Sequence, residues 1–354
     1  MEVVNLEKFK DTLFIWELSL DGKINRVNGV LPICIEALKY NIKKIIVPKE
    51  NLKEALLVSE IEAIGVSNLN ELISYLNGQI NLEQEQIDLN SILKSKQIYL
   101  EDFCDVKGQE TIKRALEISA AGGHNCLLIG APGSGKTMMA KRLPTILPDL
   151  SFEESLEITK IHSVAGTLDT DGLITKRPFR SPHHTISPNG LIGGGKIPKP
   201  GEISLSHYGV LFLDELPEFN RNTLEVLRGP LEDRKVTISR VNASITYPCN
   251  FMLIASMNPC PCGFYGSKEK ECSCTIKERE KYISKISGPL LDRIDIHIEV
   301  PNVKYNDLSK GDSESSINIK ARVDKARKIQ VERYKNYRDI FKFRTYTKIN
   351  RKIL

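Results

Sequence analysis

The stretch Gly130-Ala131-Pro132-Gly133-Ser134-Gly135-Lys136-Thr137 decides the fold, because it matches the phosphate-loop pattern G-x-x-x-x-G-K-[ST] at every fixed position. An apolar run, 126–129, precedes it, and a segment of helical character, 138–143, follows it. A buried strand, a glycine-rich loop and a helix start form the context in which this motif binds phosphate. The stretch therefore predicts an α/β fold with a nucleoside triphosphate site.

Each residue type in this loop suits the chemistry of a phosphate group. Glycines let the backbone curl so that successive N–H groups point at phosphate oxygens, and the helix dipole adds to that field. Lys136 is expected to reach the β- and γ-phosphates, and the Thr137 hydroxyl is expected to ligate Mg²⁺. The loop residues expected to bind the nucleotide are Gly130, Gly133, Ser134, Gly135, Lys136 and Thr137.

Length and composition favour a cytoplasmic protein of more than one domain. A chain of 354 residues is too long for a single compact core. No apolar run approaches the ~20 residues that cross a bilayer, and the N-terminus lacks the basic head and apolar stretch of a signal peptide. The net charge of +5 is too small to indicate nucleic acid by itself.

Apolar runs and polar breaks predict the domain organisation. Residues 1–77 alternate short apolar runs with helical patterns and predict a small α/β domain, and polar residues 78–97 predict a linker. Residues 98–303 predict a second α/β unit, since the continuous runs 126–129, 210–213 and 251–255 are typical of a parallel sheet covered by helices. Residues 304–354 predict a linker, a charged helix from about 319 to 338, and a basic tail.

Polar residues follow two of these expected strands. Asp214 and Glu215 come directly after 210–213, so Asp214 is expected to hold Mg²⁺ and Glu215 to polarise the attacking water. Asn258 lies beyond the end of 251–255 and is expected to reach the γ-phosphate or orient the water, or else to cap a turn before a proline. Arg293 stands among carboxylates, as an internal ion-pair partner or as an arginine finger for a neighbouring subunit.

Two basic segments are candidates for contacting a phosphate backbone. The segment 177–199 is rich in Pro, Gly and basic residues, and is either a mobile surface loop or a pore insert acting through Arg180, Lys196 and Lys199. The hairpin-like stretch 235–247, with Arg240, is the second candidate. The adjacent His183 and His184 are a weak metal signal, because neighbouring histidines need further ligands to hold an ion.

Cysteines cluster late in the chain. Cys260 and Cys262 form one C-x-C pair, and Cys272 and Cys274 form another, with nine residues between the pairs. Four thiolates on two turns suit a structural Zn²⁺ site, although the usual spacing is C-x₂-C, and free or redox-sensitive thiols are the alternative.

Several motifs together resemble the ComM/YifB family of magnesium-chelatase-like AAA+ ATPases. They are the phosphate loop, VLFLDELPEF at 210–219, MNPCPCG at 257–263, GPLLDRIDIHIEV at 288–300, RPFRSPHHTIS at 177–187 and KPGEISLS at 199–206. The first 77 residues, for example LFIWELSLDGKINRVNGVLP, resemble the second half of that family's Lon-protease-like N-terminal domain. The resemblance implies an AAA+ core, with a parallel sheet flanked by helices, after a partial Lon-like domain.

The resemblance also implies roles for single residues. Lys136 and Thr137 match Walker A, Asp214 and Glu215 match Walker B, Asn258 matches sensor 1, and Arg293 matches the arginine finger. It implies ATP and Mg²⁺ as cofactors, a homo-hexameric ring, and branch migration or helicase-like remodelling of DNA in competence. Contacts to DNA are expected at the backbone, because nothing in the chain reads bases.

The ends of the chain depart from the family pattern. The start of the Lon-like domain and the C-terminal lid have no recognisable counterpart, which predicts a fragment whose turnover and ring assembly are open. Two alternatives therefore stand beside a DNA-remodelling motor. One is the ATPase subunit of a magnesium chelatase, and the other is a truncated nucleotide-binding protein without turnover.

Overall fold

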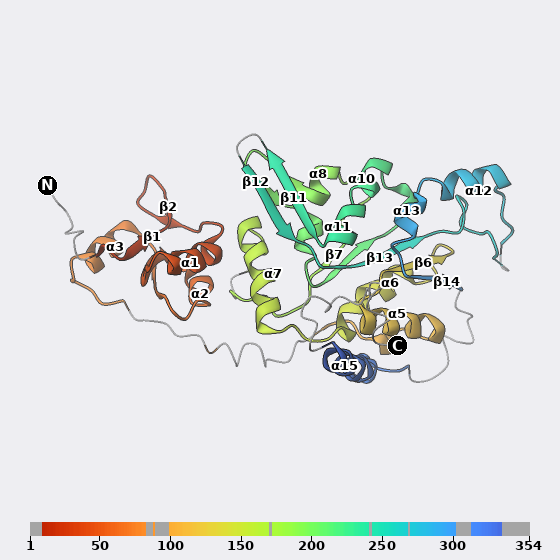
Figure 1. The fold of residues 1–354 in the computed structure, drawn as a ribbon, viewed down its shortest axis with the longest axis horizontal. Helices are drawn as coiled ribbons and strands as arrows, with labels where there is room; N and C mark the ends of the chain where they lie inside the picture. Colours follow the sequence, from red (N-terminus) through yellow and green to blue (C-terminus); the bar gives the residue numbers. More distant parts are fainter. Residues whose placement is uncertain are drawn as a thin grey trace. The chain divides into compact units, whose positions relative to one another are not determined.

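The computed structural model describes residues 9–82, 88, 99–169, 172–240, 243–267, 270–301 and 313–334. Most of the expected linker, residues 304–312 and the basic tail lie outside the described residues. The chain divides into two compact units, one formed by residues 1–97 with 150–176, the other by 98–149 with 177–354. Each unit is described by itself below, and Figure 1 labels many of the elements of both.

The first unit is a three-stranded parallel sheet, in the order β1-β4-β5, packed against helices. Its apolar strand β4 is buried along almost its whole length, as the continuous run 44–48 predicts. The elements of this unit are β1 (Thr12–Phe14), β2 (Glu17–Leu18), β3 (Ile24–Asn25), α1 (Val30–Lys39), β4 (Lys44–Pro48), η2 (Lys49–Asn51), α2 (Leu52–Ala55), β5 (Glu62–Val66), α3 (Leu69–Leu76) and α7 (Phe152–Ala165).

Helix α7 belongs to this first unit, which differs from the sequence-based division that placed it within 98–303. Phe152 and Leu156 pack against the apolar cluster beneath α1 and β4. The buried carboxylate of Glu54 accepts hydrogen bonds from the Ser163 hydroxyl and, at 2.8 Å, from the N–H of Leu31. Residues 150–176 therefore lie between two segments of the second unit in the sequence, but they complete the hydrophobic core of the first unit.

The second unit is built on five parallel strands in the order β14-β6-β13-β10-β7. This confirms the predicted parallel sheet flanked by helices. Its elements are η3 (Phe103–Asp105), α5 (Glu110–Gly122), β6 (Cys126–Gly130), α6 (Lys136–Arg142), η4 (Leu143–Ile146), β7 (Phe179–Arg180), α8 (Pro188–Ile192), β8 (Gly193–Gly194), β9 (Lys199–Pro200), α9 (Glu202–Leu205), β10 (Val210–Leu213), η5 (Leu216–Glu218), α10 (Arg221–Glu225), α11 (Arg228–Asp233), β11 (Lys235–Arg240), β12 (Ala243–Pro248), β13 (Met252–Met257), α12 (Ile276–Ile283), α13 (Gly288–Leu291), β14 (Ile296–Val300) and α15 (Ser316–Arg333).

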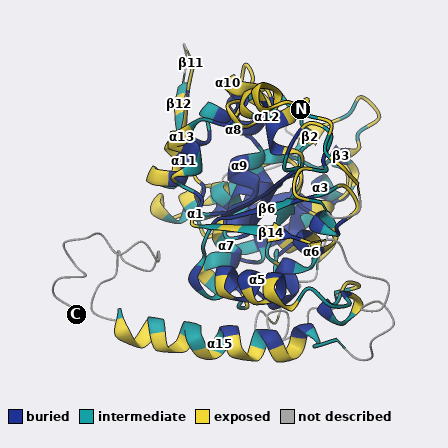
Figure 2. Cartoon of the chain, turned by 90° about the vertical axis from the view of Figure 1, so that its right-hand side faces the viewer, coloured by how far each residue is buried: buried dark blue, intermediate teal, exposed yellow. Residues whose placement is uncertain are grey.

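Both faces of this sheet are covered, which explains the continuous apolar runs. Side chains alternate between the two faces of a strand, and one alternating set, including Leu128, Phe212 and Ile254, packs in a single cluster with α5, α6 and α15. The other set, such as Leu127 and Leu211, is equally buried. Figure 2 shows the central strands of the sheet dark blue in the interior, whereas α15 carries exposed residues, drawn yellow, along its length.

Strand β13 lies between β6 and β10, and this arrangement positions the candidate site. Leu213 of β10 pairs in register with Ala255 of β13, and Met257 pairs with Ile129 of β6. Because all three strands are parallel, their carboxyl ends meet at one edge of the sheet. The phosphate loop, Asp214 and Asn258 each follow one of these ends.

Candidate nucleotide site

The phosphate loop folds as its glycines predict. Gly133 and Gly135 have φ of 76° and 87°, in the left-handed region that side chains disfavour. A Cβ on Gly130 would lie 2.5 Å from the Val300 carbonyl oxygen, so β14 can pack closely only because this position is glycine. Helix α6 begins at Lys136, and its N-terminus therefore opens onto the loop.

Lys136 occupies the inside of this loop. Its Nζ donates hydrogen bonds to the carbonyl oxygens of Gly130 and Ala131, at 2.7 and 2.9 Å, and to the amide oxygen of Asn258 at 3.4 Å. The side chain is buried, and burial lowers its pKa while the Asp214 and Glu215 carboxylates act in the opposite direction. A cation that is desolvated and held by three neutral acceptors is suited to an anionic ligand.

Asp214 joins the helix after the phosphate loop to strand β13. The Thr137 hydroxyl donates to Asp214 Oδ2 at 2.7 Å, and the Ser256 hydroxyl donates to Asp214 Oδ1. The Glu215 backbone N–H also donates to Oδ1, at 3.1 Å. The sequence motifs predict no role for Ser256. The signal that could have indicated one is a hydroxyl in a fully buried strand, since Leu213 pairs with Ala255 and the next residues along the two strands are Asp214 and Ser256.

Glu215 is exposed at the edge of the sheet and takes up a left-handed backbone conformation with φ of 54°. The His184 ring lies beside it, with Nδ1 3.9 Å from Glu215 Oε2. The ring centroids of His184 and His183 lie 4.1 Å apart with the planes tilted by 35°, and His183 Nδ1 contacts the Thr185 hydroxyl. These histidines therefore flank Glu215, and no third metal ligand joins them in the described chain.

Two predicted residues lie away from Lys136. The Arg293 guanidinium, just beyond α13, contacts the Pro289 carbonyl and the Glu232 carboxylate of α11. The side chain of Arg180 forms a paired ion bridge with Glu202, at 2.6 and 2.7 Å, so it is engaged within the unit. Arg293 does not join the nucleotide loop of its own chain.

The other residues predicted to contact the phosphate backbone of a nucleic acid lie on small hairpins. Lys196 and Lys199 are exposed at the β8–β9 pair, and the expected hairpin at 235–247 is confirmed as β11 and β12, with Arg240 exposed at its end. None of the helices in the described part of the chain combines the length and apolar character that a membrane crossing requires.

The four late cysteines converge in space. Their sulfur atoms lie within 4.8 Å of one another, although they come from two separate turns. Within the described residues this is the sole group of three or more Cys, His, Asp or Glu that could hold a metal ion.

Comparison with known proteins places this geometry in a family. The family described as magnesium chelatase, subunit ChlI matches residues 102–308, and the family described as subunit ChlI of Mg-chelatase matches residues 2–51. YifB of Escherichia coli is 43% identical over 334 residues, and the competence protein ComM of Haemophilus influenzae is 42% identical over 337. In both cases the alignment covers 94% of this chain and 65% of the relative, so the chain spans about two thirds of their length.

A more distant relative is the magnesium-chelatase 38 kDa subunit of Rhodobacter capsulatus, 25% identical over 174 residues, which are 44% of this chain and 50% of that protein. Its match is shorter and weaker than those of the two proteins above. The parallel sheet, the phosphate loop and these similarities agree, and the chain belongs to the magnesium-chelatase-like family that includes YifB and ComM.

Proposed function

We propose that this chain is an AAA+ ATPase that binds Mg²⁺–ATP between its phosphate loop and the carboxyl ends of β10 and β13. The observation that carries the proposal is the convergence of Lys136, Asp214 and Asn258 at one edge of a parallel sheet. Lys136 and Asp214 are 78 positions apart, and Asp214 and Asn258 are 44 apart. Each follows a different strand, and all three meet around a single loop.

The residues present fit such a ligand. Among the described residues, buried Ser134 Oγ has no hydrogen-bond partner and Lys136 Nζ has only neutral acceptors, so both can turn to phosphate oxygens. A hydroxyl and a carboxylate in contact, Thr137 and Asp214, are the oxygen donors that Mg²⁺ prefers. When bound, Mg²⁺ supplies Lewis-acid stabilisation of charge on the phosphoryl oxygens.

Each side chain then has a separate task. Lys136 binds the phosphates, Asn258 orients the γ-phosphate or the water, and Glu215 takes up a proton from the attacking water. Ser256 orients the Asp214 carboxylate through its hydroxyl. Glu215 is exposed, which leaves its carboxylate accessible to a water molecule.

The work coupled to hydrolysis is proposed to be remodelling of DNA by a homo-hexameric ring. Exposed Lys196, Lys199 and Arg240 on two hairpins support contacts to a phosphate backbone, and the relative ComM is a competence protein. The ATPase subunit of a magnesium chelatase is the second candidate, favoured by the match to the 38 kDa subunit. Both candidates use the same nucleotide site.

Nucleotide binding and turnover test the first part. Lys136→Ala should abolish binding of a fluorescent ATP analogue, because it removes the only lysine in the loop. Glu215→Gln should bind the analogue as the unaltered chain does and lose turnover by about 10²–10⁴-fold, since it removes the general base. The control is Glu218→Gln, a neighbouring exposed carboxylate paired with Lys285 at 3.5 Å, which should leave turnover unchanged. Equal turnover by Glu215→Gln would refute the assignment.

Stimulation by DNA tests the second part. Single- and double-stranded DNA should raise the ATPase rate, and the effect should fall steeply with salt because the contacts are to phosphates. The double variant Lys196→Ala/Lys199→Ala should lose stimulation and keep the basal rate. Turnover that does not respond to DNA favours the chelatase alternative, whereas binding without turnover leaves a nucleotide-binding protein.

A further inference from the structure

Cys260, Cys262, Cys272 and Cys274 form a cluster between the end of β13 and the start of α12. The Cys260 sulfur lies 3.4 Å from that of Cys262 and 3.7 Å from that of Cys272, and the sulfurs of Cys262 and Cys272 are 3.6 Å apart. None of the four forms a disulfide. The sulfurs therefore surround a common centre rather than pairing off.

These separations match one tetrahedral metal ion. With Zn–S bonds of about 2.3 Å, tetrahedral geometry places neighbouring sulfurs about 3.8 Å apart, whereas a disulfide would bring two of them to about 2.05 Å. We propose that the four thiolates bind a single Zn²⁺ in a structural site. The proposal stands on the sulfur positions and does not depend on the ATPase activity proposed above.

The surroundings of the cluster suit a metal thiolate centre. The N–H of Cys262 donates to Cys274 Sγ and the N–H of Tyr265 donates to Cys260 Sγ, both at 3.3 Å. Such outer hydrogen bonds orient ligands and stabilise their negative charge. Four thiolates around one divalent cation keep a net negative charge. Two cations lie close by in the chain, Lys270 of the loop and Arg279 of α12, and they contact the rings of Phe264 and Tyr265.

An iron–sulfur cluster fits less well than a single ion. Tetrahedral sulfur ligation is used by zinc and by iron–sulfur centres alike. A cluster places its irons and bridging sulfides between the cysteines, which drives the thiolates apart, whereas here all four sulfurs lie within 4.8 Å. The geometry therefore favours a mononuclear site, and the metal analysis below separates zinc from iron.

The metal would close a loop that begins beside the nucleotide site and leads into α12. Asn258 precedes Cys260 by two residues, and Thr275, directly after Cys274, is the N-cap of α12. Tyr282 of α12 is buried beside the Asn258 backbone, and burial raises its pKa to about 12. In the same loop, a Cβ on Gly263 would lie 2.6 Å from Pro132 Cδ of the phosphate loop.

Zinc therefore stabilises the loop after β13 in the conformation that keeps Asn258 next to Lys136. This consequence, unlike the metal site itself, rests on the proposed ATPase function. Without the ion, the polar and glycine-rich loop has few apolar contacts to hold it, since Cys260 and Gly263 are its buried residues among those described between 258 and 275.

Metal content of the full chain, purified in reducing buffer without chelator, is the direct test. Elemental analysis should find about one zinc and negligible iron per chain. Cys272→Ser/Cys274→Ser should hold less than roughly a tenth of that amount, because it removes half the ligands. The matched control Cys104→Ser, altered at a half-buried cysteine outside the cluster, should keep its zinc.

The result that overturns the proposal is a chain without zinc that also fails to give the visible spectrum of tetrahedral cobalt thiolate when titrated with Co²⁺. Iron in place of zinc, or a disulfide among the four cysteines found by mass spectrometry of the non-reduced protein, would overturn it as well.

A second measurement guards against a variant that fails to fold. Stripping the unaltered chain with a chelator should lower its melting temperature, and Zn²⁺ but not Mg²⁺ should restore it. The stripped chain should still bind the ATP analogue through its phosphate loop, but its rate of ATP turnover should fall by about 10-fold or more. Should the chain prove to have no ATPase activity at all, zinc content and melting temperature still decide the metal site.

Discussion

At the scale of single residues, Asp214 shows how the candidate site is built. Its two carboxylate oxygens receive separate hydroxyl donors, Thr137 from α6 and Ser256 from β13, which fixes the plane of the group. Both donors are neutral, so the negative charge of the carboxylate is left for a cation. Ser256 has no exposed surface and touches no substrate position, which makes it a positioning residue.

Replacing Ser256 with alanine should weaken the Mg²⁺ dependence of ATP binding and turnover. Loss of an outer hydrogen bond to a metal ligand typically lowers metal affinity or activity about 10–100-fold. The Mg²⁺ concentration for half-maximal turnover should rise by a factor in that range, while binding of nucleotide without metal should be unchanged. Titrating Mg²⁺ at fixed ATP measures the shift.

Ser239→Ala is the matched control, because its hydroxyl is exposed on β11 and pairs with that of Ser244 at 3.1 Å. It should reproduce the Mg²⁺ titration of the unaltered chain. Identical titrations for the Ser256 and Ser239 variants would show that Asp214 needs no support from β13.

The same residues show how far a motif can predict a site. Lys136, Thr137 and Asp214 were predictable because the loop pattern and the strand ends are local in sequence, and the structure brings them together. The role of Ser256 and the contact of His184 with Glu215 were not predictable, because they depend on strand register and on the path of the 177–199 segment. Local periodicity carries no information on either.

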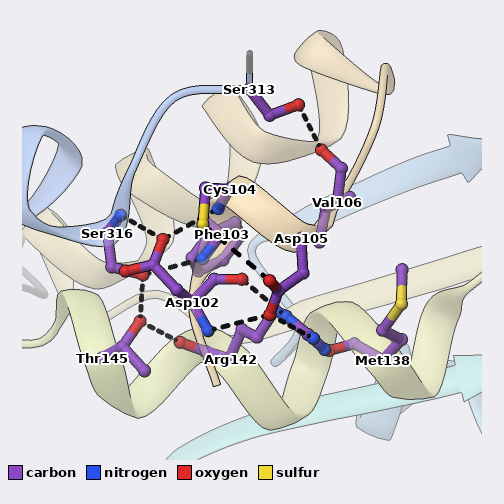
Figure 3. Close-up of polar contacts among 10 residues, drawn as sticks. All are labelled: Asp102, Phe103, Cys104, Asp105, Val106, Met138, Arg142, Thr145, Ser313 and Ser316. Atoms are coloured by element: carbon purple, nitrogen blue, oxygen red, sulfur yellow. Dashed lines mark hydrogen bonds and ion pairs between the residues drawn. The ribbon is translucent and has the colours of Figure 1, made fainter. Parts of the chain in front are cut away.

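At the scale of elements, the first turn of the second unit is clamped to its last described helix. Asp102 caps η3 by accepting the Cys104 N–H at 2.8 Å, and the same oxygen accepts the Ser316 N–H at the start of α15 at 2.9 Å. The Ser316 hydroxyl accepts a hydrogen bond from Thr145 at 2.8 Å, and Arg142 of α6 donates to the Asp102 carbonyl at 2.8 Å (Figure 3). One carboxylate therefore joins η3 to α15, beside the helix that follows the phosphate loop.

Asp102→Ala should lower the free energy of unfolding by about 1–2 kcal/mol at neutral pH, the typical effect of losing a capping side chain. Partial burial raises the pKa of Asp102, but the N–H groups of Cys104 and Ser316 outweigh it and hold the pKa below its ordinary value. A depressed pKa means that the carboxylate stabilises the fold fully above about pH 4 and ceases to do so as the pH falls through the folded-state pKa. Denaturant melts at pH 7 and near pH 3 should show the variant's deficit shrinking in acid.

Asp233→Ala, at the exposed end of α11, provides the comparison. Its deficit should be small at both pH values. A deficit of Asp102→Ala that stays constant from pH 7 to pH 3 would mean that the carboxylate charge takes no part in the clamp.

Element boundaries were predictable where one pattern dominated. The runs that indicated strands became β4, β6, β10 and β13, and the charged helix expected at about 319–338 is described as Ser316–Arg333. The clamp was not predictable, because Asp102 and Ser316 are 214 positions apart and meet only after the sheet is assembled. Helix α7 raised the same difficulty: its own sequence shows a helix with a capping box, but not which unit its apolar side chains enter.

At the scale of the whole molecule, Arg293 bears on how subunits would cooperate. In this chain the guanidinium is held beside α11 by Glu232, and the backbone carbonyl of Arg293 accepts a hydrogen bond from Asn125 at 2.7 Å. Asn125 immediately precedes β6, so it lies at the amino end of the sheet, opposite the edge that carries the phosphate loop. An arginine finger in this position can therefore serve only a neighbouring subunit's nucleotide.

Mixing two inactive variants tests this arrangement. Arg293→Ala keeps its own phosphate loop but offers no finger, and Lys136→Ala offers a finger but cannot bind ATP. In a ring with head-to-tail interfaces, some Arg293→Ala chains then receive the guanidinium of a Lys136→Ala neighbour. Each variant alone should lose at least about 10³-fold in turnover, and the mixture should regain a rate well above the sum of the two.

Light scattering of the Glu215→Gln chain with ATP should find a hexamer, the assembly on which the mixing experiment depends.

Glu232→Ala separates a finger from a structural ion pair, because it removes the carboxylate that holds Arg293 and leaves the guanidinium in place. It should keep turnover, because the guanidinium proposed to serve the neighbouring subunit's nucleotide is retained. A mixture of Arg293→Ala and Lys136→Ala that stays inactive although hexamers form would show that Arg293 stabilises only its own chain, and that the charge on the transferred phosphoryl group is met by residues of a single subunit.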